Sequence, residues 1–438
     1  MVDRGSAVLR ALSGIVLLLG LVALGIVAED RFSDAASAGT EVASAVLVAA
    51  ESDESADAVP TTIVAPVDTS TPSKSVSVAA TTELEPPPRR TATVAFTGDT
   101  LAHRGVVRQA ASYAGSGELE YDFSPMFAEV EPHLAAADLA ICHLETPLSP
   151  DNTSLSGYPT FNVPGDLAAA LAGAGYDGCS TASNHSLDKR SQGAFDTLDV
   201  LDSAGVGHTG MARSADERAE TTLYDAGGIP VAHLSYSYGF NGFTVPADMP
   251  WLVNSIDVDV IASDAAAARA AGAEYVVVSL HWGVEYRSDP TDEQLRIAEQ
   301  LLSADEIDVL IGHHAHVVQP VGTFNGKPVV FGLGNFLSNQ SASCCEIGAQ
   351  DGVIVQVHIQ ELADRSGFRS WLSYVPTRVD RADFTIVPLP DRLDDPALDP
   401  DQRQTLEISR ARTHERLTAI EGVGSGLVEA PARYRSDS

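Results

Sequence analysis

The chain has 438 residues, of which 60 are Asp or Glu and 27 are Lys or Arg, so its formal net charge is −33. This charge argues against a protein that binds nucleic acid through the phosphate backbone. Hydrophobic residues make up 44% of the chain, enough for a large core, and four cysteines are too few for a fold held together by disulfides.

The first predicted element is an uncharged apolar segment at residues 11–28, preceded by Arg4 and Arg10. As a helix, it would cover roughly 27 Å of a hydrocarbon layer roughly 30 Å thick. We therefore expect residues 1–28 to form a short cytoplasmic stub and a single-pass transmembrane helix, with the rest of the chain outside the cell membrane. The alternative is a cleaved signal peptide and a secreted protein.

Two further segments flank the predicted domain. Residues 29–90 are rich in Ala, Ser, Thr and Pro without a sustained period, which predicts a disordered linker. Residues 391–438 begin as an acidic, proline-rich stretch and predict a tail without catalytic residues. Between them, residues 91–390 contain no strong repeat and no linker-like interruption, which predicts one large α/β domain.

Within this domain, short runs rich in Val, Ile and Leu alternate with helical patterns, as strands and helices do in α/β proteins. The predicted strands are 93–96, 139–143, 230–236, 275–280, 309–312, 329–331 and 353–359. The predicted helices are 164–174, 193–204, 255–271 and 291–304, the last beginning with a capping-box spacing of Thr291 and Gln294. The later part is mostly strands, so we expect sheets stacked in layers and covered by helices.

Polar side chains gather at five predicted strand ends. They are Asp99, Glu145, Asn184 with His185, His281, and His314 with His316. Because α/β folds place ligand sites at such ends, we expect these side chains to meet. Carboxylate, amide and imidazole donors together suit Zn²⁺, Mn²⁺ or Fe better than Ca²⁺. The pattern predicts one or two divalent metal ions bridged by a carboxylate.

The sequence resembles a known family through five motifs that occur in order: GDTLAHRGVV, HLETPLS, SNHSLDKRSQGAFDTLDVLDSAGV, SLHWGVEY and GHHAHVVQPVGTFNGKPVVFGLGNF. They lie between about Val94 and Phe336 and are similar to the bacterial capsule synthesis CapA family of poly-γ-glutamate capsule proteins. The resemblance implies a calcineurin-like metallophosphatase fold, which is a four-layer α/β/β/α sandwich. It also implies a membrane-anchored role in the assembly, transport or attachment of an anionic polymer such as poly-γ-glutamate, beside other membrane subunits of capsule synthesis.

The same resemblance implies metal-ligand positions at Asp99, Glu145, Asn184, His185, His281, His314 and His316. Some residues depart from the family pattern. His143 stands where Asn is usual before Leu-Glu, and Ser183 stands where many members have Asn. The first histidine after Asp99 is His103, further along than in metallophosphatases proper. One metal site is therefore expected to be weaker, differently built, or completed by His103 or His143.

Several of these residues also have an ordinary structural explanation. Asp99 could cap a helix, and Glu145 could be a surface carboxylate. His314 and His316 are harder to explain in this way, because alternate residues of an extended segment share a face. By the same rule, His313 is expected to point away from the site and to be structural.

His185, Asp188 and Arg190 are the candidate catalytic residues. His185 could act as a general acid if it is not a metal ligand, because imidazole titrates close to neutral pH. Asp188 and Arg190 are better suited to bind backbone or substrate than metal.

The cysteines allow two interpretations. Cys142 and Cys179 each lie beside proposed ligands, so either a thiolate ligand or a disulfide is conceivable. Cys344 and Cys345 are adjacent, and we expect them to be buried or to bridge elsewhere rather than to each other.

Two classes of function follow from these features. In the first, a metal-dependent hydrolase or transferase activates water for attack on a phosphoester or an amide-like carbonyl of the polymer. In the second, a non-catalytic accessory subunit binds the polymer within a membrane biosynthesis complex, and a secreted metal-dependent phosphoesterase is a further alternative. The sequence has no Gly-rich phosphate loop, GxSxG elbow or GxGxxG fingerprint, which argues against nucleotide-triphosphate, serine-hydrolase and dinucleotide chemistry.

Overall fold

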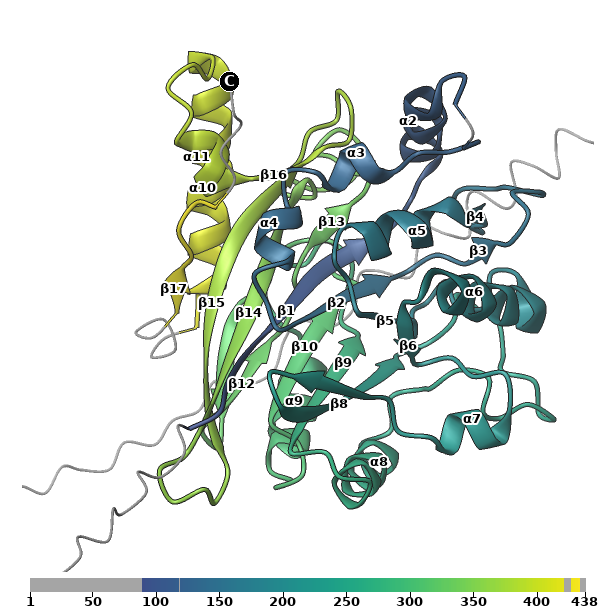
Figure 1. Ribbon diagram of the computed structural model, residues 1–438, viewed down its shortest axis with the longest axis vertical. Coiled ribbons are helices and arrows are strands. Elements are labelled where there is room, and N and C mark those ends of the chain that lie inside the picture. Colours follow the sequence, from purple (N-terminus) through teal and green to yellow (C-terminus); the bar gives the residue numbers. More distant parts are fainter. Residues whose placement is uncertain (1–88, 118, 421–426, 434–438) are drawn as a thin grey trace, which may run out of the picture. The chain divides into compact units, whose positions relative to one another are not determined.

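The computed structural model describes residues 89–117, 119–420 and 427–433. Their strands form two large sheets stacked face to face, with helices on the outer face of each sheet (Figure 1). The predicted transmembrane segment and nearly all of the predicted linker lie outside the described residues. Among the described helices, none is both long enough and apolar enough to cross a membrane.

In the described part of the chain, the first sheet contains nine strands. Its order is β16 (Ile386–Pro388), β15 (Phe368–Val379), β14 (Asp351–Glu361), β1 (Thr91–Thr100), β2 (Leu139–Leu144), β5 (Gly178–Ser180) and β6 (Gly207–Thr209). Beside this path, β13 (Asn335–Leu337) pairs with β1, and β17 (Val428–Glu429) pairs with β15. The sheet is mixed, because β1 is parallel to β2 and antiparallel to β14.

The second sheet contains six strands among the described residues. Their order is β11 (Val321–Phe324), β12 (Lys327–Val330), β10 (Val309–His313), β9 (Tyr275–His281), β8 (Ile229–Ser237) and β7 (Leu223–Ala226). The four central strands, from β12 to β8, are parallel, so their carboxyl ends share one edge. A short separate pair joins β3 (Leu148–Ser149) to β4 (Val163–Pro164).

The side chains of the central strands alternate between two cores. In β1, Val94 and Phe96 lie in the core between the sheets, whereas Ala95 lies in the core beneath the helices of the first sheet. In β9, Val277 lies between the sheets and Val278 lies beneath the helices of the second sheet. Strands that are buried on both faces read as continuous apolar runs, which explains why these strands are recognisable in the sequence.

The helices cover both outer faces, which completes four layers. On the first sheet lie α2 (Arg104–Ala114), α3 (Ser124–Phe127), α4 (Glu131–Leu134) and α5 (Asp166–Gly173), and on the second lie α8 (Val258–Ala270) and α9 (Asp292–Leu302). The other helices are α6 (Arg190–Ala204), α7 (Ala215–Ala219), α10 (Leu389–Leu393) and α11 (Pro400–Leu417). The predicted capping box of Thr291 and Gln294 is confirmed at the start of α9. The layered α/β architecture predicted from the sequence is therefore the one observed.

The folded domain extends past the predicted boundary at residue 390. Asp351 of β14 is buried, and its carboxylate accepts hydrogen bonds from Ser409 (2.6 Å) and Arg412 (2.7 Å) of α11. A segment that looks like an acidic tail by composition therefore packs on the sheet, because its own polar side chains satisfy a buried carboxylate.

A buried histidine in β8 predicts acid sensitivity of the fold. Nε2 of His233 lies 2.9 Å from Ser279 Oγ, and burial lowers the pKa of His233 to about 3. The unfolded chain binds this proton near pH 6.5, so its contribution to stability is complete above that pH and is lost progressively as pH falls towards 3. Between pH 7 and pH 5, we expect the free energy of unfolding to fall by about 2 kcal/mol less in His233→Gln than in the wild type. Urea denaturation at both pH values measures this, and an unchanged pH dependence in the variant would contradict it.

Candidate metal centre

The carboxyl ends of β1, β2, β9 and β10 meet at one edge of the stacked sheets. Asp99 of β1 lies opposite His143 of β2 in the first sheet, and His281 of β9 lies opposite His313 of β10 in the second. The two sheets touch at this edge, where Nε2 of His143 is 2.9 Å from Nδ1 of His281. Donor side chains from two separate sheets thus converge on one buried centre.

The first group of potential metal ligands consists of Asp99, His143 and His313. One ligand atom from each lies within 4.8 Å of the others, and all three residues are buried. Nδ1 of His313 is 3.3 Å from Oδ1 of Asp99, and the ring of His143 stacks on that of His313 at a centroid distance of 4.0 Å. The group has a carboxylate and two imidazoles, a donor set typical of Zn²⁺, Mn²⁺ or Fe sites.

The second group consists of Glu145, His314 and His316, which meet the same distance criterion and are also buried. Nε2 of His316 is 3.7 Å from Oε1 of Glu145. The two groups adjoin at Asp99, whose Oδ2 lies 3.0 Å from Nδ1 of His316. Asp99 is therefore the carboxylate placed to bridge two metal ions.

Two further predicted ligands border the second group. Nε2 of His281 lies 4.0 Å from Oε1 of Glu145 and 3.1 Å from Oδ1 of Asn184. Both side chains are buried. His281 and Asn184 are thus adjacent to the two groups and within reach of a shared ion after small side-chain movements.

The structure keeps His185 outside both groups. Its Nδ1 lies 2.7 Å from Oδ2 of Asp188, which also accepts a hydrogen bond from the backbone N–H of Phe161 at 2.6 Å. Asn241 also lies near Nδ1, with its Nδ2 at 3.3 Å. Asp188 therefore fixes the ring of His185 and leaves Nε2 free of hydrogen bonds within the described residues. A ring held in this way by a carboxylate can act as a metal ligand or as a proton donor, and the position of His185 outside both groups favours the proton donor.

The expectation that His313 points away from the site is wrong. That expectation assumed an extended segment, but His314 and His316 have φ angles of 88° and 55°, in the left-handed region. The backbone therefore turns sharply after β10, and all three histidines reach the centre. Such conformations are strained in residues other than glycine, and they concentrate at functional sites.

The sequence analysis offered His143 and His103 as residues that could complete the metal site where the chain departs from the family pattern. The structure places His143 in the first group, at the centre of the site. Nδ1 of His103 instead lies 2.9 Å from the carbonyl oxygen of Leu101 and receives the backbone N–H of Asn339 at 3.4 Å. His103 therefore belongs to the loop structure beside the centre and to neither ligand group.

Unpartnered polar atoms show that the centre suits a bound cation. Within the described residues, both carboxylate oxygens of Glu145 and Nδ1 of His314 are buried without a hydrogen-bond partner. Burying a polar group without a partner costs several kcal/mol, roughly 2 to 7 for a neutral group and more for a charge. A divalent metal ion would supply the missing partner to all of these atoms, so the residues present fit the predicted metal.

Three histidines of the centre have protonation preferences that fit metal binding, whereas Glu145 and Asp99 overcome the effect of burial and raise the pKa of His316 to about 9. Burial, together with neighbouring imidazoles, holds the pKa values of His143 and His281 well below the usual range, and burial lowers that of His314 to about 3. These histidines are therefore neutral, which is the form that binds metal. Burial would raise the pKa of Asp99, but the imidazoles of His313 and His316 outweigh it and keep the carboxylate ionised.

Glu145 behaves in the opposite way. Burial raises its pKa well above the usual range, and the nearby charge of Asp99 adds to this, although His316 opposes both. Without a bound cation, this buried carboxylate is more stable in its protonated, neutral form. Metal binding at the second group is therefore expected to displace that proton.

Comparison with known proteins identifies the family. The family described as bacterial capsule synthesis protein PGA_cap matches residues 93–340, which is more than half of the chain. The chain belongs to this family.

Three relatives illustrate the capsule-synthesis match. The chain is 26% identical over 244 residues to the PGA biosynthesis protein CapA of Bacillus subtilis, covering 54% of this chain and 61% of the relative. It is 24% identical over 249 residues to the capsule biosynthesis protein CapA of Bacillus anthracis, covering 55% and 59%. It is also 26% identical over 293 residues to the "Probable polyglutamine synthesis accessory protein" of Mycobacterium tuberculosis, covering 63% and 76%. The chain thus spans about 60% of the length of the two Bacillus relatives.

Two solved structures are similar to part of the chain. The calcineurin-like phosphoesterase YfkN of Bacillus subtilis is 14% identical with a TM-score of 0.39, covering 75% of this chain and 98% of that one. The NAD nucleotidase of Haemophilus influenzae is 9% identical with a TM-score of 0.39, covering 79% and 65%. Membership of the capsule-synthesis family rests on the sequence match and not on these structures.

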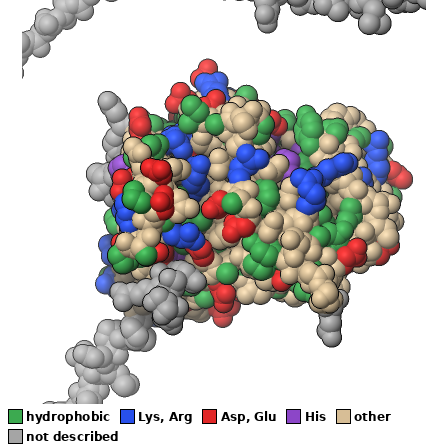
Figure 2. Space-filling view, turned by 90° about the horizontal axis from the view of Figure 1, so that it is seen from above, with side chains coloured by type: hydrophobic (Ala, Val, Ile, Leu, Met, Phe, Trp, Pro, Cys, Tyr) green, Lys and Arg blue, Asp and Glu red, His purple; other side chains and the backbone are tan. Residues whose placement is uncertain are grey.

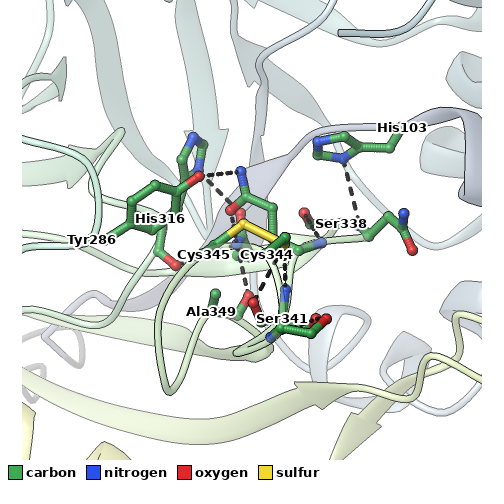
Figure 3. The surroundings of a disulfide bond; sticks show 12 residues. His103, Tyr286, His316, Ser338, Ser341, Cys344, Cys345 and Ala349 are labelled. Carbon is green, nitrogen blue, oxygen red and sulfur yellow. Dashed lines mark hydrogen bonds between the residues drawn. A yellow bond between two sulfur atoms is a disulfide. The ribbon is translucent and has the colours of Figure 1, made fainter.

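Asn335 is a residue of the family-matched region that the sequence analysis missed. Its Oδ1 lies 3.1 Å from Nδ1 of His316, and its Nδ2 donates to Oε1 of Gln340 (2.9 Å) and to the carbonyl oxygen of Ala349 (2.8 Å). Gln340 in turn donates to the hydroxyl of Tyr286 at 3.1 Å, and Figure 3 shows this network beside His316. Asn335 lies in the sequence GLGNF, just after the apolar run of β12, which is the signal that could have drawn attention to it; its pairing with Asp99 is seen only in the structure.

The cysteines do not act as thiolate ligands, since all four are paired. Cys142 and Cys179 face each other in register on β2 and β5 and form a disulfide. Cys344 and Cys345 are bonded to each other, so the expectation that they bridge elsewhere is wrong. The reason is local, because both backbone N–H groups point to the carbonyl oxygen of Ser341 in a tight turn (Figure 3). This disulfide lies beyond the family-matched residues.

Tyr238, a half-exposed aromatic side chain beside the second ligand group, was also missed. It is 50% exposed, and its ring lies 4.6 Å from that of His314 and 6.3 Å from that of His281. Figure 2 shows Lys and Arg side chains interspersed with Asp and Glu side chains over one face, with histidine visible among them.

Proposed function

We propose that this capsule-synthesis protein uses one or two divalent metal ions to act on an anionic polymer outside the cell membrane. The reaction would either hydrolyse a bond of the polymer or transfer a group to or from it. The observation that carries this proposal is the pair of buried ligand groups that adjoin where Asp99 of the first contacts His316 of the second. Family membership supports the proposal that the substrate is an anionic polymer, because the names of the relatives refer to PGA, polyglutamine or capsule synthesis.

The ligand roles follow from the two groups. Asp99, His143 and His313 would hold one ion, and Glu145, His314 and His316 the other, with His281 and Asn184 at their border. Bound divalent ions would polarise a phosphoryl or carbonyl oxygen and lower the pKa of a coordinated water towards neutrality. They would also supply the positive charge that an acidic protein needs in order to attract an acidic polymer.

The chain's own residues would handle the leaving group. Asp188 accepts the Nδ1 proton of His185 and holds the ring in one orientation. Nε2 of His185 is then the nitrogen that can donate a proton to the departing oxygen or nitrogen. Tyr238, whose ring lies 4.6 Å from that of His314, would position the polymer beside the centre.

The test uses the full chain purified without chelator. We expect about one or two equivalents of Mn, Zn or Fe by elemental analysis, and turnover of phosphoester or γ-glutamyl substrates that disappears with chelator and returns with Mn²⁺ or Zn²⁺. His281→Ala and His314→Ala should each lower the bound metal. Unchanged metal stoichiometry in both variants would contradict the proposed centre.

A second candidate is a polymer-binding accessory subunit without turnover. The departures from the family pattern at His143 and Ser183 favour it, since they alter the surroundings of one metal site. Polymer binding that survives chelation, together with no turnover under any metal, would establish this alternative. The proposed single-pass anchor at residues 11–28 is tested separately by membrane fractionation, because a cleaved signal would release the protein.

A further inference from the structure

Arg190 adopts a backbone conformation that does not suit it. It is the first residue of α6, directly after the segment that carries His185 and Asp188, and its φ angle is 60°. This left-handed region favours glycine, because a Cβ atom crowds the neighbouring carbonyl oxygen. The start of α6 gains no side-chain capping bond in return. A strained arginine that offers the helix no benefit calls for another explanation.

The side chain of Arg190 is held in place without being neutralised. Its guanidinium carbon lies 4.0 Å above the ring of Phe243, in a cation–π contact. The residue is exposed, and within the described part of the chain no carboxylate pairs with it. Arg213 shows the contrast, because it pairs with Asp199 and Asp202 of the same helix at 2.6 and 2.7 Å. Arg190 therefore keeps its charge and its hydrogen-bond donors available.

The segment that carries His185 and Arg190 meets the loop after β8 at two points. Nδ1 of His185 lies 3.3 Å from Asn241, and the guanidinium of Arg190 lies 4.0 Å from the ring of Phe243. The same loop carries Tyr238, whose ring lies 4.6 Å from that of His314 in the second ligand group. Asn241 and Phe243 are two residues apart, so their Cα atoms are separated by at most roughly 7 Å, and His185 and Arg190 contact neighbouring parts of one loop.

We propose that Arg190, stacked on Phe243, is a specificity-determining residue that binds an oxyanion of the substrate next to the bond that reacts. This inference rests on the proposed function and names the feature of the substrate that the site recognises. A guanidinium offers a planar fork of donors that matches a carboxylate or a phosphate, and stacking fixes the plane of that fork. In a γ-linked glutamate chain, every residue carries one free carboxylate, so a residue bound at the centre would place its neighbour's carboxylate near Arg190.

The experiment measures binding and stability together in the metal-loaded full chain. A γ-linked glutamate trimer and phenyl phosphate are titrated by calorimetry into the wild type, Arg190→Gly and Arg190→Lys, with Arg296→Gln as control. Arg296 is an exposed arginine on α9 that pairs with Glu293, remote in sequence from the centre. We expect Arg190→Gly to weaken the binding of at least one probe by about tenfold or more, and Arg190→Lys to weaken it less, because a lysine keeps the charge but loses the fork.

The stability readout separates this role from a structural one. Because glycine relieves the strain at a φ of 60°, Arg190→Gly should unfold at the same temperature as the wild type or higher, while its affinity falls. A lower unfolding temperature with unchanged affinity would show a structural role and overturn the inference, as would equal affinities in all four proteins. The probe that depends on Arg190 distinguishes a carboxylate from a phosphate. A wild type that carries metal but binds neither probe would overturn the proposed function together with this inference.

Discussion

Asp99→Asn is expected to empty both halves of the metal centre, because Asp99 contacts His313 at 3.3 Å in one ligand group and His316 at 3.0 Å in the other. An amide has the same shape but lacks the charge that offsets a divalent ion. Since altering even outer-shell partners of metal sites typically costs about 10- to 100-fold in affinity, loss of a bridging ligand should cost at least about 100-fold at both positions. Turnover should fall to background.

Elemental analysis after purification without chelator measures this loss. Asp364→Asn is the matched control, because Asp364 is an exposed carboxylate in a turn and bonds only to Ser366. The control should retain the wild-type metal content. Retention of even one full equivalent in Asp99→Asn would contradict the bridging role and leave two independent sites.

Glu145→Gln is expected to separate metal binding from folding. The variant should lose the ion of the second group, because Glu145 belongs to that group. It should retain the ion of the first group, which does not include Glu145. The metal-free protein should be no less stable than the wild type, because the substitution replaces a buried carboxylate whose oxygens have no partner. This result is unusual, since most substitutions of fully buried residues destabilise by about 1 kcal/mol or more.

Thermal unfolding with and without added Mn²⁺ or Zn²⁺ provides the readout. The wild type should gain more stability from metal than Glu145→Gln, because ligand binding to the folded state adds to the free energy of unfolding. If the metal-free variant unfolds well below the metal-free wild type, the carboxylate has a structural role and the second group is not a metal site.

The layers of the fold and the edge that carries the site follow from features that a sequence displays. Strands buried on both faces leave continuous apolar runs such as that of β9, and the polar residue that ends each run marks the edge. Asp99, Glu145, His281 and His316 come together for this reason. The family motifs carried the same information, since each ends a strand at the shared edge.

Other parts of the centre depend on geometry that no periodicity encodes. His313 ends β10 in register with His281, and left-handed backbone at His314 and His316, which a rule based on extended strands excludes, brings those two histidines to the same centre. Asn335 reaches His316 only because β13 lies beside β1, far from it in sequence. The packing of α11 likewise depends on Asp351, whose need for partners becomes visible only in the folded sheet.

The division of the ligands between two sheets has a consequence for how the protein acquires metal. Asp99 and His143 belong to one sheet, His281 and His313 to the other, and neither sheet alone holds a complete ligand group. A nascent or partly folded chain would therefore lack a complete site for the proposed ions. Their affinity would arise only when residues as distant as Asp99 and His316 are brought together, and bound metal would stabilise the two sheets against separation.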